Sequence, residues 1–167
     1  MSILETLEQH GSSRLFWFTD RPTGLRAVVA IDDLTLGPAA GGVRTRSYTS
    51  EQEALADVCG LAQAMTRKCA LAGLRAGGAK ALVLEHALID RPAAFMKLGE
   101  FIEELGGLFR TAGDLGTTTD DLKAMAKTTQ YVHTDTTRLA GSVARTTLRS
   151  MEAALEVLAA MYPRLGE

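Results

Sequence analysis

The run of residues 79–84, Ala-Lys-Ala-Leu-Val-Leu, is apolar at every position except Lys80. Successive side chains of a β-strand point to opposite faces of the sheet, so a strand of this composition needs a covering layer on each face. The run therefore predicts a strand inside a layered domain. It also places a lysine at the edge of the core, where charged side chains are rarely found without a partner.

The flanking segments predict strands and helices in alternation. Residues 14–19 and 25–31 are β-prone runs around the turn-forming residues 20–24, which is typical of a hairpin. Helices are predicted after Ser50 and after Asp90, each a preferred N-cap residue, and a short strand at 108–112. The small residues 36–42 predict a structured loop. We expect an α/β fold: a single layered domain with a mixed β-sheet flanked by helices.

Composition excludes several classes of function. The 167 residues carry a net charge of −2 with scattered basic residues, so neither nucleic acid nor a membrane surface is an expected partner. The beginning of the chain lacks the basic region of a signal peptide, and no apolar run approaches the ~20 residues of a membrane span, which favours a cytoplasmic protein. Cys59 and Cys69 have neither disulfide nor metal-ligand spacing on one helix, so no metal site is predicted.

Two lysines lie on positions that the pattern predicts to face the core. The helix after Ser50 carries an apolar stripe whose next member is Lys68; the stripe comprises Ala54, Leu55, Val58, Leu61, Ala62 and Met65. A lysine in a last helical turn is also explained by the helix dipole, with its ammonium reaching solvent. Lys80 is different, because an ammonium in an apolar strand is desolvated and loses its proton more readily.

An acid and a pair of glycines complete the set. Asp114 lies in the connection between the strand at 108–112 and the next helix, where it is either a turn residue or a catalytic group. Gly41 and Gly42 allow backbone to approach another group closely. One cation for a carboxylate, one amine with a lowered pKa and one acid are what a site for an amino acid needs.

These motifs, in this order, resemble the N-terminal, substrate-binding domain of the glutamate/leucine/phenylalanine/valine dehydrogenase family, and within it most closely the leucine dehydrogenases. The resemblance covers nearly the whole chain. It rests on the hairpin, Thr35-Leu-Gly-Pro-Ala-Ala-Gly-Gly42, the Lys68 helix, Gly77-Gly78-Ala-Lys80, Thr111-Ala-Gly-Asp114-Leu-Gly-Thr117 and Arg149-Ser-Met-Glu-Ala-Ala154.

The resemblance implies a role for each matching residue. Lys68 would bind the substrate α-carboxylate, Lys80 would be the catalytic lysine that activates water, and Asp114 would exchange protons with the amino group. The resemblance also implies substrate contacts around them. Backbone at Gly41 and Gly42 and the side chain of Met65 would touch the substrate, while Ala40 and Ala112 would line its side-chain pocket, with extra room at Ala40.

The resemblance also implies a division of the chain and a missing cofactor site. Residues 1–141 would form the substrate domain, and 142–167 a helix like the one that leads to the family's cofactor domain. No Gly-x-Gly-x-x-Gly fingerprint is present. NAD would then be bound only through a separate Rossmann subunit, not by this chain alone. The segment 133–141 is shorter than in the family, Val143 stands where the family has threonine, and Gly113 replaces an acidic residue.

Three functions remain open from the sequence. The chain is the catalytic half of an L-amino-acid dehydrogenase for a small or branched amino acid, a stand-alone cofactor-independent enzyme acting on an amino acid, keto acid or imine, or a non-catalytic protein that binds amino acids or oligomerises. Under each of them the expected partners are a small amino or keto acid and further copies of the chain in a homo-oligomer.

Overall fold

The computed structural model describes residues 3–134 and Glu156. A five-stranded sheet forms its centre, with the strand order β1-β2-β4-β3-β5. Its strands are β1 (Arg14–Asp20), β2 (Leu25–Asp33), β3 (Ala39–Arg46), β4 (Gly77–Leu84) and β5 (Phe109–Gly113). β2 pairs antiparallel with both β1 and β4, whereas β3 pairs parallel with both β4 and β5. The expected α/β fold with a mixed sheet is confirmed, and β4, the run that predicted it, is buried at every position.

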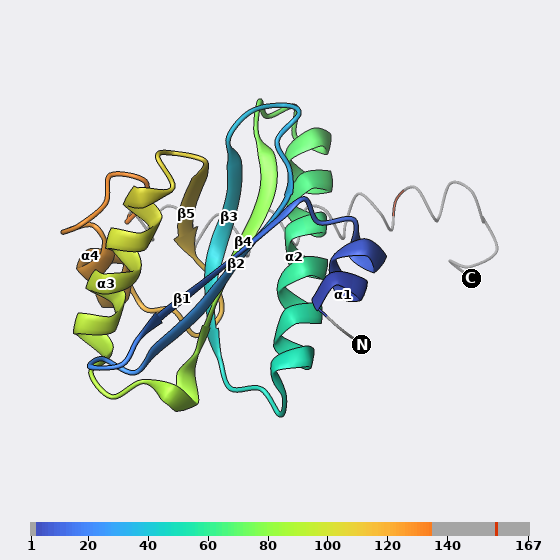
Figure 1. Ribbon diagram of the computed structural model, residues 1–167. Coiled ribbons are helices and arrows are strands. Elements are labelled where there is room, and N and C mark those ends of the chain that lie inside the picture. Colours follow the sequence, from blue (N-terminus) through green and yellow to red (C-terminus); the bar gives the residue numbers. More distant parts are fainter. Residues whose placement is uncertain (1–2, 135–155, 157–167) are drawn as a thin grey trace. The chain divides into compact units, whose positions relative to one another are not determined.

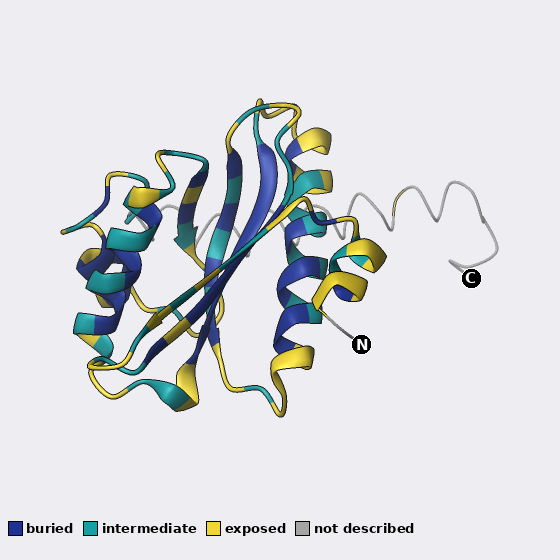
Figure 2. Cartoon of the chain, viewed as in Figure 1, coloured by how far each residue is buried: buried dark blue, intermediate teal, exposed yellow. Residues whose placement is uncertain are grey.

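Helices cover both faces of this sheet (Figure 1). On one side lie α1 (Ile3–His10) and the long α2 (Glu51–Leu71); on the other lie α3 (Arg91–Glu104) and α4 (Thr119–Met125). A 3-10 turn, η1 (Glu85–Ala87), leads from β4 toward α3. Alternate residues of β4 enter separate cores: Leu82 and Leu84 pack with α2, while Ala81 and Val83 pack with the α3 side. Figure 2 shows the buried residues along the central strands and on the inner sides of the helices.

The predicted turn and the two predicted helix caps are confirmed by hydrogen bonds. Thr23 N and Oγ1 both donate to Asp20 Oδ2, at 3.1 and 2.8 Å, in the hairpin turn. Ser50 caps α2 by accepting from Glu53 N at 3.1 Å, and Asp90 caps α3 by accepting from Ala93 N at 3.1 Å. These short polar side chains satisfy backbone donors that a first helical turn leaves without partners.

The predicted loop at residues 36–42 is wrong in its second half, which is the beginning of β3. A Cβ atom built on Gly41 would lie 1.7 Å from the carbonyl oxygen of Ala79 on β4, so only glycine permits this strand pairing. Glycine is depleted in strands generally and therefore concealed the strand in the sequence pattern.

The predicted stripe of α2 is confirmed at Ala54, Leu55, Val58 and Ala62, which are buried, but its later members are wrong. Lys68 is exposed rather than core-facing, and Leu61 and Met65 are only half-buried. The residues that do face the sheet are mostly small: Ala54, Leu55, Val58, Cys59, Ala62 and Cys69. Small residues are used because the helix and β4 nearly touch, as a Cβ atom on Gly78 would lie 2.1 Å from Thr66 N.

Cys59 and Cys69 are both buried and free. Within the part of the chain that the structure describes, no helix is long and apolar enough to cross a membrane. The predicted helix at 142–167, the domain limit at 141, Val143 and most of the segment 133–141 lie outside the described residues.

Candidate active site

Lys80 occupies the α2 side of β4 and is only 5% exposed. Its Nζ atom lies 2.8 Å from Asp114 Oδ2. Burial lowers the pKa of Lys80, and the positive charges of Arg44 and Lys68 act in the same direction, while the hydrogen bond and charge of Asp114 oppose the shift. A buried amine with a lowered pKa is suited to accept a proton near neutral pH.

Asp114 follows directly after β5 and reaches across to the neighbouring strands. Burial by itself would raise the pKa of Asp114, but the hydrogen bond and charge of Lys80 and the charge of Arg44 outweigh it and lower the pKa. Arg44 Nε donates to Asp114 Oδ2 at 2.9 Å, so one carboxylate oxygen serves two cations. Two cations thus hold Asp114 in its ionised form.

The two predicted glycines occupy different faces of β3. A Cβ atom on Gly42 would lie 2.9 Å from the Cβ atom of Asp114 and 3.3 Å from Lys80 Nζ, so Gly42 leaves the space between the two groups open. Gly41 is directed to the opposite face of β3, where the Ala79 carbonyl of β4 leaves no space for a side chain. Gly41 can therefore offer only main-chain atoms to the site.

The two predicted alanines lie beside Gly42. Ala112 is its partner in the register of β3 and β5, and Ala40 is two residues earlier on β3, on the same face. Both are half-buried. These positions carry small side chains beside Gly42, while Arg110, the register partner of Ala40 on β5, lies on the same face of the sheet.

Lys68 and Met65 both lie on α2. They are three residues apart, which places them on one side of the helix. Lys68 is exposed, lies in the last turn of α2, and makes no ion pair with any residue of 3–134. Its charge nonetheless reaches Lys80, whose pKa it helps to lower. Lys68 is thus a cation that acts on the buried pair and has no counter-ion within the described part of the chain.

Three residues of this cluster, Arg44, Asp57 and Tyr48, were not predicted from the sequence. Arg44 also donates through Nη1 to Asp57 Oδ2 on α2 at 3.2 Å, and Tyr48 Oη donates to the same oxygen at 2.5 Å. Arg44 was not predicted because β3 was not predicted. In a strand, side chains alternate between faces, so Ala40, Gly42 and Arg44 would have been placed on the same face. Nothing in the spacing of Asp57 and Tyr48 indicated their contact.

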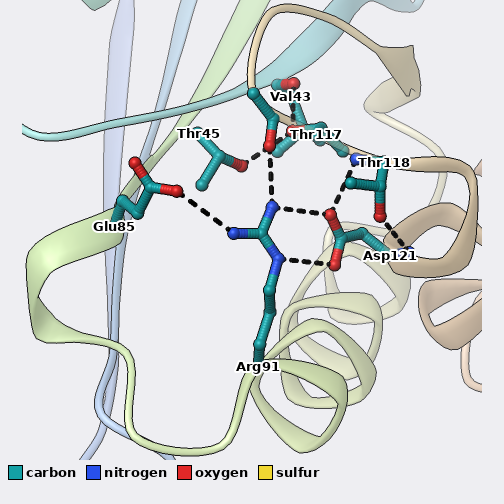
Figure 3. Close-up of polar contacts among 8 residues, drawn as sticks. Val43, Thr45, Glu85, Arg91, Thr117, Thr118 and Asp121 are labelled. Atoms are coloured by element: carbon teal, nitrogen blue, oxygen red, sulfur yellow. Dashed lines mark hydrogen bonds and ion pairs between the residues drawn. The ribbon is translucent and has the colours of Figure 1, made fainter.

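A second polar cluster, drawn in Figure 3, holds the loop that carries Asp114. Arg91, the first residue of α3, donates to both carboxylate oxygens of Asp121 at 2.9 and 2.8 Å and to the Gly116 carbonyl at 2.7 Å. Glu85 accepts a fourth hydrogen bond from Arg91 at 3.3 Å. The guanidinium thereby ties α3, α4 and the loop together.

The same loop is bound to β3 from its other side. Thr117 Oγ1 donates to the Val43 carbonyl at 2.7 Å, so the Thr45 hydroxyl, 2.7 Å away, donates to Thr117 Oγ1. Thr45 N donates to the Leu115 carbonyl at 2.9 Å. Gly116 has φ 78° and passes so close to the Thr45 carbonyl that a Cβ atom would lie 1.9 Å from it. These contacts fix the backbone from which Asp114 extends.

Comparison with known proteins gives a consistent result. Residues 15–131 match the Glu/Leu/Phe/Val dehydrogenase, dimerisation domain. Leucine dehydrogenase of Bacillus cereus is 41% identical over 133 residues, which are 79% of this chain and 36% of that protein. Phenylalanine dehydrogenase of Bacillus thermotolerans is 43% identical over 133 residues, covering 78% and 34%.

A solved structure with the same fold is that of L-tryptophan dehydrogenase from Nostoc punctiforme, with a TM-score of 0.73 and 34% identity, covering 77% of this chain and 38% of that one. The chain spans about a third of the length of the curated relatives that it matches. By the match over residues 15–131, the chain belongs to the Glu/Leu/Phe/Val dehydrogenase family.

Proposed function

We propose that this chain is the substrate-binding and catalytic half of an L-amino-acid dehydrogenase, which oxidatively deaminates a small or branched amino acid. The observation that carries the proposal is the buried Lys80 held 2.8 Å from Asp114, near Lys68, a cation that has no ion-pair partner among residues 3–134. The names of similar proteins, leucine, phenylalanine and L-tryptophan dehydrogenase, support the substrate class.

Binding begins with the charges of the substrate. An amino acid presents a carboxylate and an ammonium, and in this proposal the carboxylate pairs with Lys68 while the ammonium approaches Asp114. The half-buried Met65, on the same side of α2 as Lys68, contacts the substrate backbone, as do the main-chain atoms of Gly41 and Gly42. This orientation directs the substrate Cα toward Lys80.

Asp114 and Lys80 then divide the proton transfers. Ionised Asp114 takes a proton from the substrate ammonium, which frees the amine for oxidation to an iminium. Water adds to the iminium carbon: its oxygen bonds to carbon, its proton passes to the neutral amine of Lys80, and the C–N π electrons move onto nitrogen. Nitrogen takes its proton back from Asp114 and leaves as ammonia, while the hydroxyl group loses its proton to solvent and becomes the carbonyl of the keto acid.

The side chain of the substrate is assigned to the small residues of the sheet. Ala40 and Ala112 have small apolar side chains beside Gly42, which leave room for an aliphatic branched side chain. A polar substrate side chain would lose its hydrogen bonds to water there.

Oxidation of the amine requires a hydride acceptor, and we assign this role to NAD bound by a separate dinucleotide-binding partner. The described residues do not fit NAD themselves: none of their strand-to-helix connections carries a Gly-x-Gly-x-x-Gly loop that could hold a pyrophosphate at a helix N-terminus. The chain by itself is thus proposed to bind the amino acid and not the nucleotide.

Self-association is proposed for this chain as well. The family model that matches residues 15–131 describes a dimerisation domain. The chain also exposes several large apolar side chains, among them Trp17, Leu71, Ile89 and Leu115. Light scattering after size exclusion should give the mass of a dimer or a larger homo-oligomer. A monomer at all accessible concentrations would contradict this part of the proposal.

The central experiment mixes the purified chain with dinucleotide-binding domains from the same source organism, adds NAD and an L-amino acid, and follows NADH formation. We expect activity with small branched amino acids that disappears in Lys80→Ala. The matched control is Lys127→Ala, which removes an exposed lysine far along the chain from the site. If every combination stays silent while the chain folds and binds the amino acid, the dehydrogenase assignment fails.

A further inference from the structure

A single carboxylate oxygen of the candidate site receives two cations. Asp114 Oδ2 lies 2.8 Å from Lys80 Nζ and 2.9 Å from Arg44 Nε. The groups come from three neighbouring strands, because β3, which carries Arg44, lies between β4 and β5. The two cations therefore compete for the same acceptor and stand close enough to repel each other.

Arg44 is fixed at this position by a second carboxylate. Its Nη1 atom contacts Asp57 Oδ2 at 3.2 Å, and that oxygen also accepts the hydroxyl of Tyr48. Burial, followed by the hydrogen bond and charge of Asp57, raises the pKa of Tyr48, so the phenol remains a donor. The Arg44 side chain is 17% exposed and bridges Asp57 and Asp114 with different nitrogens.

The proposed function poses a problem that this arrangement solves. A lysine that acts as a base must lose its proton, and Asp114 would then be a half-buried carboxylate without a cation. Removing one partner of a buried ion pair is costly because the remaining charge is uncompensated. A guanidinium does not lose its proton in proteins, so Arg44 remains charged when Lys80 is neutral.

We propose that Arg44 is a positioning residue: it is the permanent counter-ion of Asp114, and by holding that carboxylate it leaves Lys80 free to give up and regain its proton. The catalytic meaning of this inference rests on the proposed function, while the charge arrangement stands without it. The other charged groups near Lys80 are Asp114 itself and Lys68 on α2. Asp32 on β2 is held by the Thr66 hydroxyl at 2.6 Å.

The test measures how the reactivity of Lys80 depends on pH. The chain alone, with neither nucleotide nor amino acid, is labelled briefly with acetic anhydride over a pH series, and each lysine is quantified by peptide mass spectrometry. The exposed Lys127 corrects for reagent and pH. In Arg44→Gln, Lys80 loses a repelling charge and becomes the sole cation on Asp114. We expect its labelling midpoint to rise by about one pH unit, which is about tenfold slower labelling below both midpoints.

Arg44→Lys is the rescue variant, because it keeps the charge, and its midpoint should stay near that of the unmodified chain. Loosening of the site alone would instead raise the labelling rate at the highest pH and would not be rescued by lysine. If Arg44→Gln does not fold, the charge-balanced pair Arg44→Gln with Asp57→Asn is used, with the same expected shift. An unchanged midpoint, or an equal rise in Arg44→Lys and Arg44→Gln, overturns the proposal.

A further arm tests the shared carboxylate. In an Asp114→Asn background, Arg44→Gln should shift the Lys80 midpoint less than in the unmodified chain, because only the direct repulsion between the two cations is left to remove. Equal shifts in the two backgrounds would overturn the proposal. Since no turnover is measured, a chain that is silent as a dehydrogenase leaves these outcomes unaffected, and a failed labelling test leaves the dehydrogenase assay to stand by itself.

Discussion

Lys80 Nζ and Asp114 Oδ2 lie 2.8 Å apart, yet the two partners are unequally buried: the lysine side chain is 6% exposed and the aspartate side chain 27%. The cost of removing a charge from water therefore falls mainly on the lysine. This inequality explains why burial lowers the pKa of Lys80 although a carboxylate touches it, while the pKa of Asp114 is lowered as well. Lys80 therefore gives up its proton more readily than an exposed lysine, and Asp114 stays ionised to lower pH than an exposed aspartate.

The first prediction concerns stability at alkaline pH. Because the folded-state pKa of Lys80 is below its ordinary value of 10.5, the unfolded chain binds more protons between the two pKa values. Stability contributed by this group therefore rises with pH across that window. Urea unfolding at a series of pH values should show the unmodified chain gaining stability relative to Lys80→Met as pH approaches 10.5. Lys127→Met is the control, and parallel curves for Lys80→Met would contradict the prediction.

A second prediction concerns Lys68, the exposed lysine in the last turn of α2. If it binds the substrate carboxylate, Lys68→Ala should weaken binding of L-leucine and of its 2-oxo acid by about 10- to 100-fold, the usual effect of losing a charge-assisted hydrogen bond. Calorimetry on the chain alone measures this effect. Lys68→Arg should retain part of the affinity and Lys127→Ala all of it. Equal binding by Lys68→Ala would remove Lys68 from the site.

Gly42 provides a third prediction. A methyl group there would meet Asp114 Cβ at 2.9 Å and Lys80 Nζ at 3.3 Å, so Gly42→Ala should push the pair apart and reduce amino-acid binding by about tenfold or more. Gly60→Ala is a matched control: it lies in α2, its nearest neighbour is 4.0 Å away, and it should stabilise the chain by about 0.5–1 kcal/mol. Calorimetric binding and thermal unfolding of both variants check this contrast.

Local chemistry made much of the fold predictable. Ser50 and Asp90 cap helices where the sequence placed them, because capping depends only on a side chain and its own next turn. The strand around Lys80 was likewise predicted from its own apolar residues alone. By contrast, β3 was concealed since Gly41 is required by a strand that is distant in sequence, and the exposed side of α2 was misassigned because small residues, not large ones, face the sheet.

The site was predictable to the extent that single residues carry chemical meaning. Lys80 and Asp114 could be selected by residue type and by their positions at element ends, and the structure brings them together. Arg44 was not selected, because the strand that would have placed it on this face was missed and its partners are Asp114, 70 residues away, and Asp57 on another element. Such contacts are a property of packing, which no local pattern encodes.

The last prediction concerns Arg91, which fixes the Asp114 loop through Asp121. Burial by itself raises the pKa of Asp121, but hydrogen bonds from Arg91 and Thr118 outweigh it and lower the pKa below its ordinary 3.8. This stabilisation is present above pH 3.8 and is lost as pH falls through the lowered value. Arg91→Met should therefore cost roughly 2 kcal/mol at neutral pH in urea unfolding, reduced by the partial exposure of Arg91, and the two curves should converge in acid. Lys97→Met, which removes an exposed pair on the same helix, should leave the unfolding midpoint unchanged, and an equal loss at all pH values would show that Arg91 acts through packing rather than through the Asp121 charge.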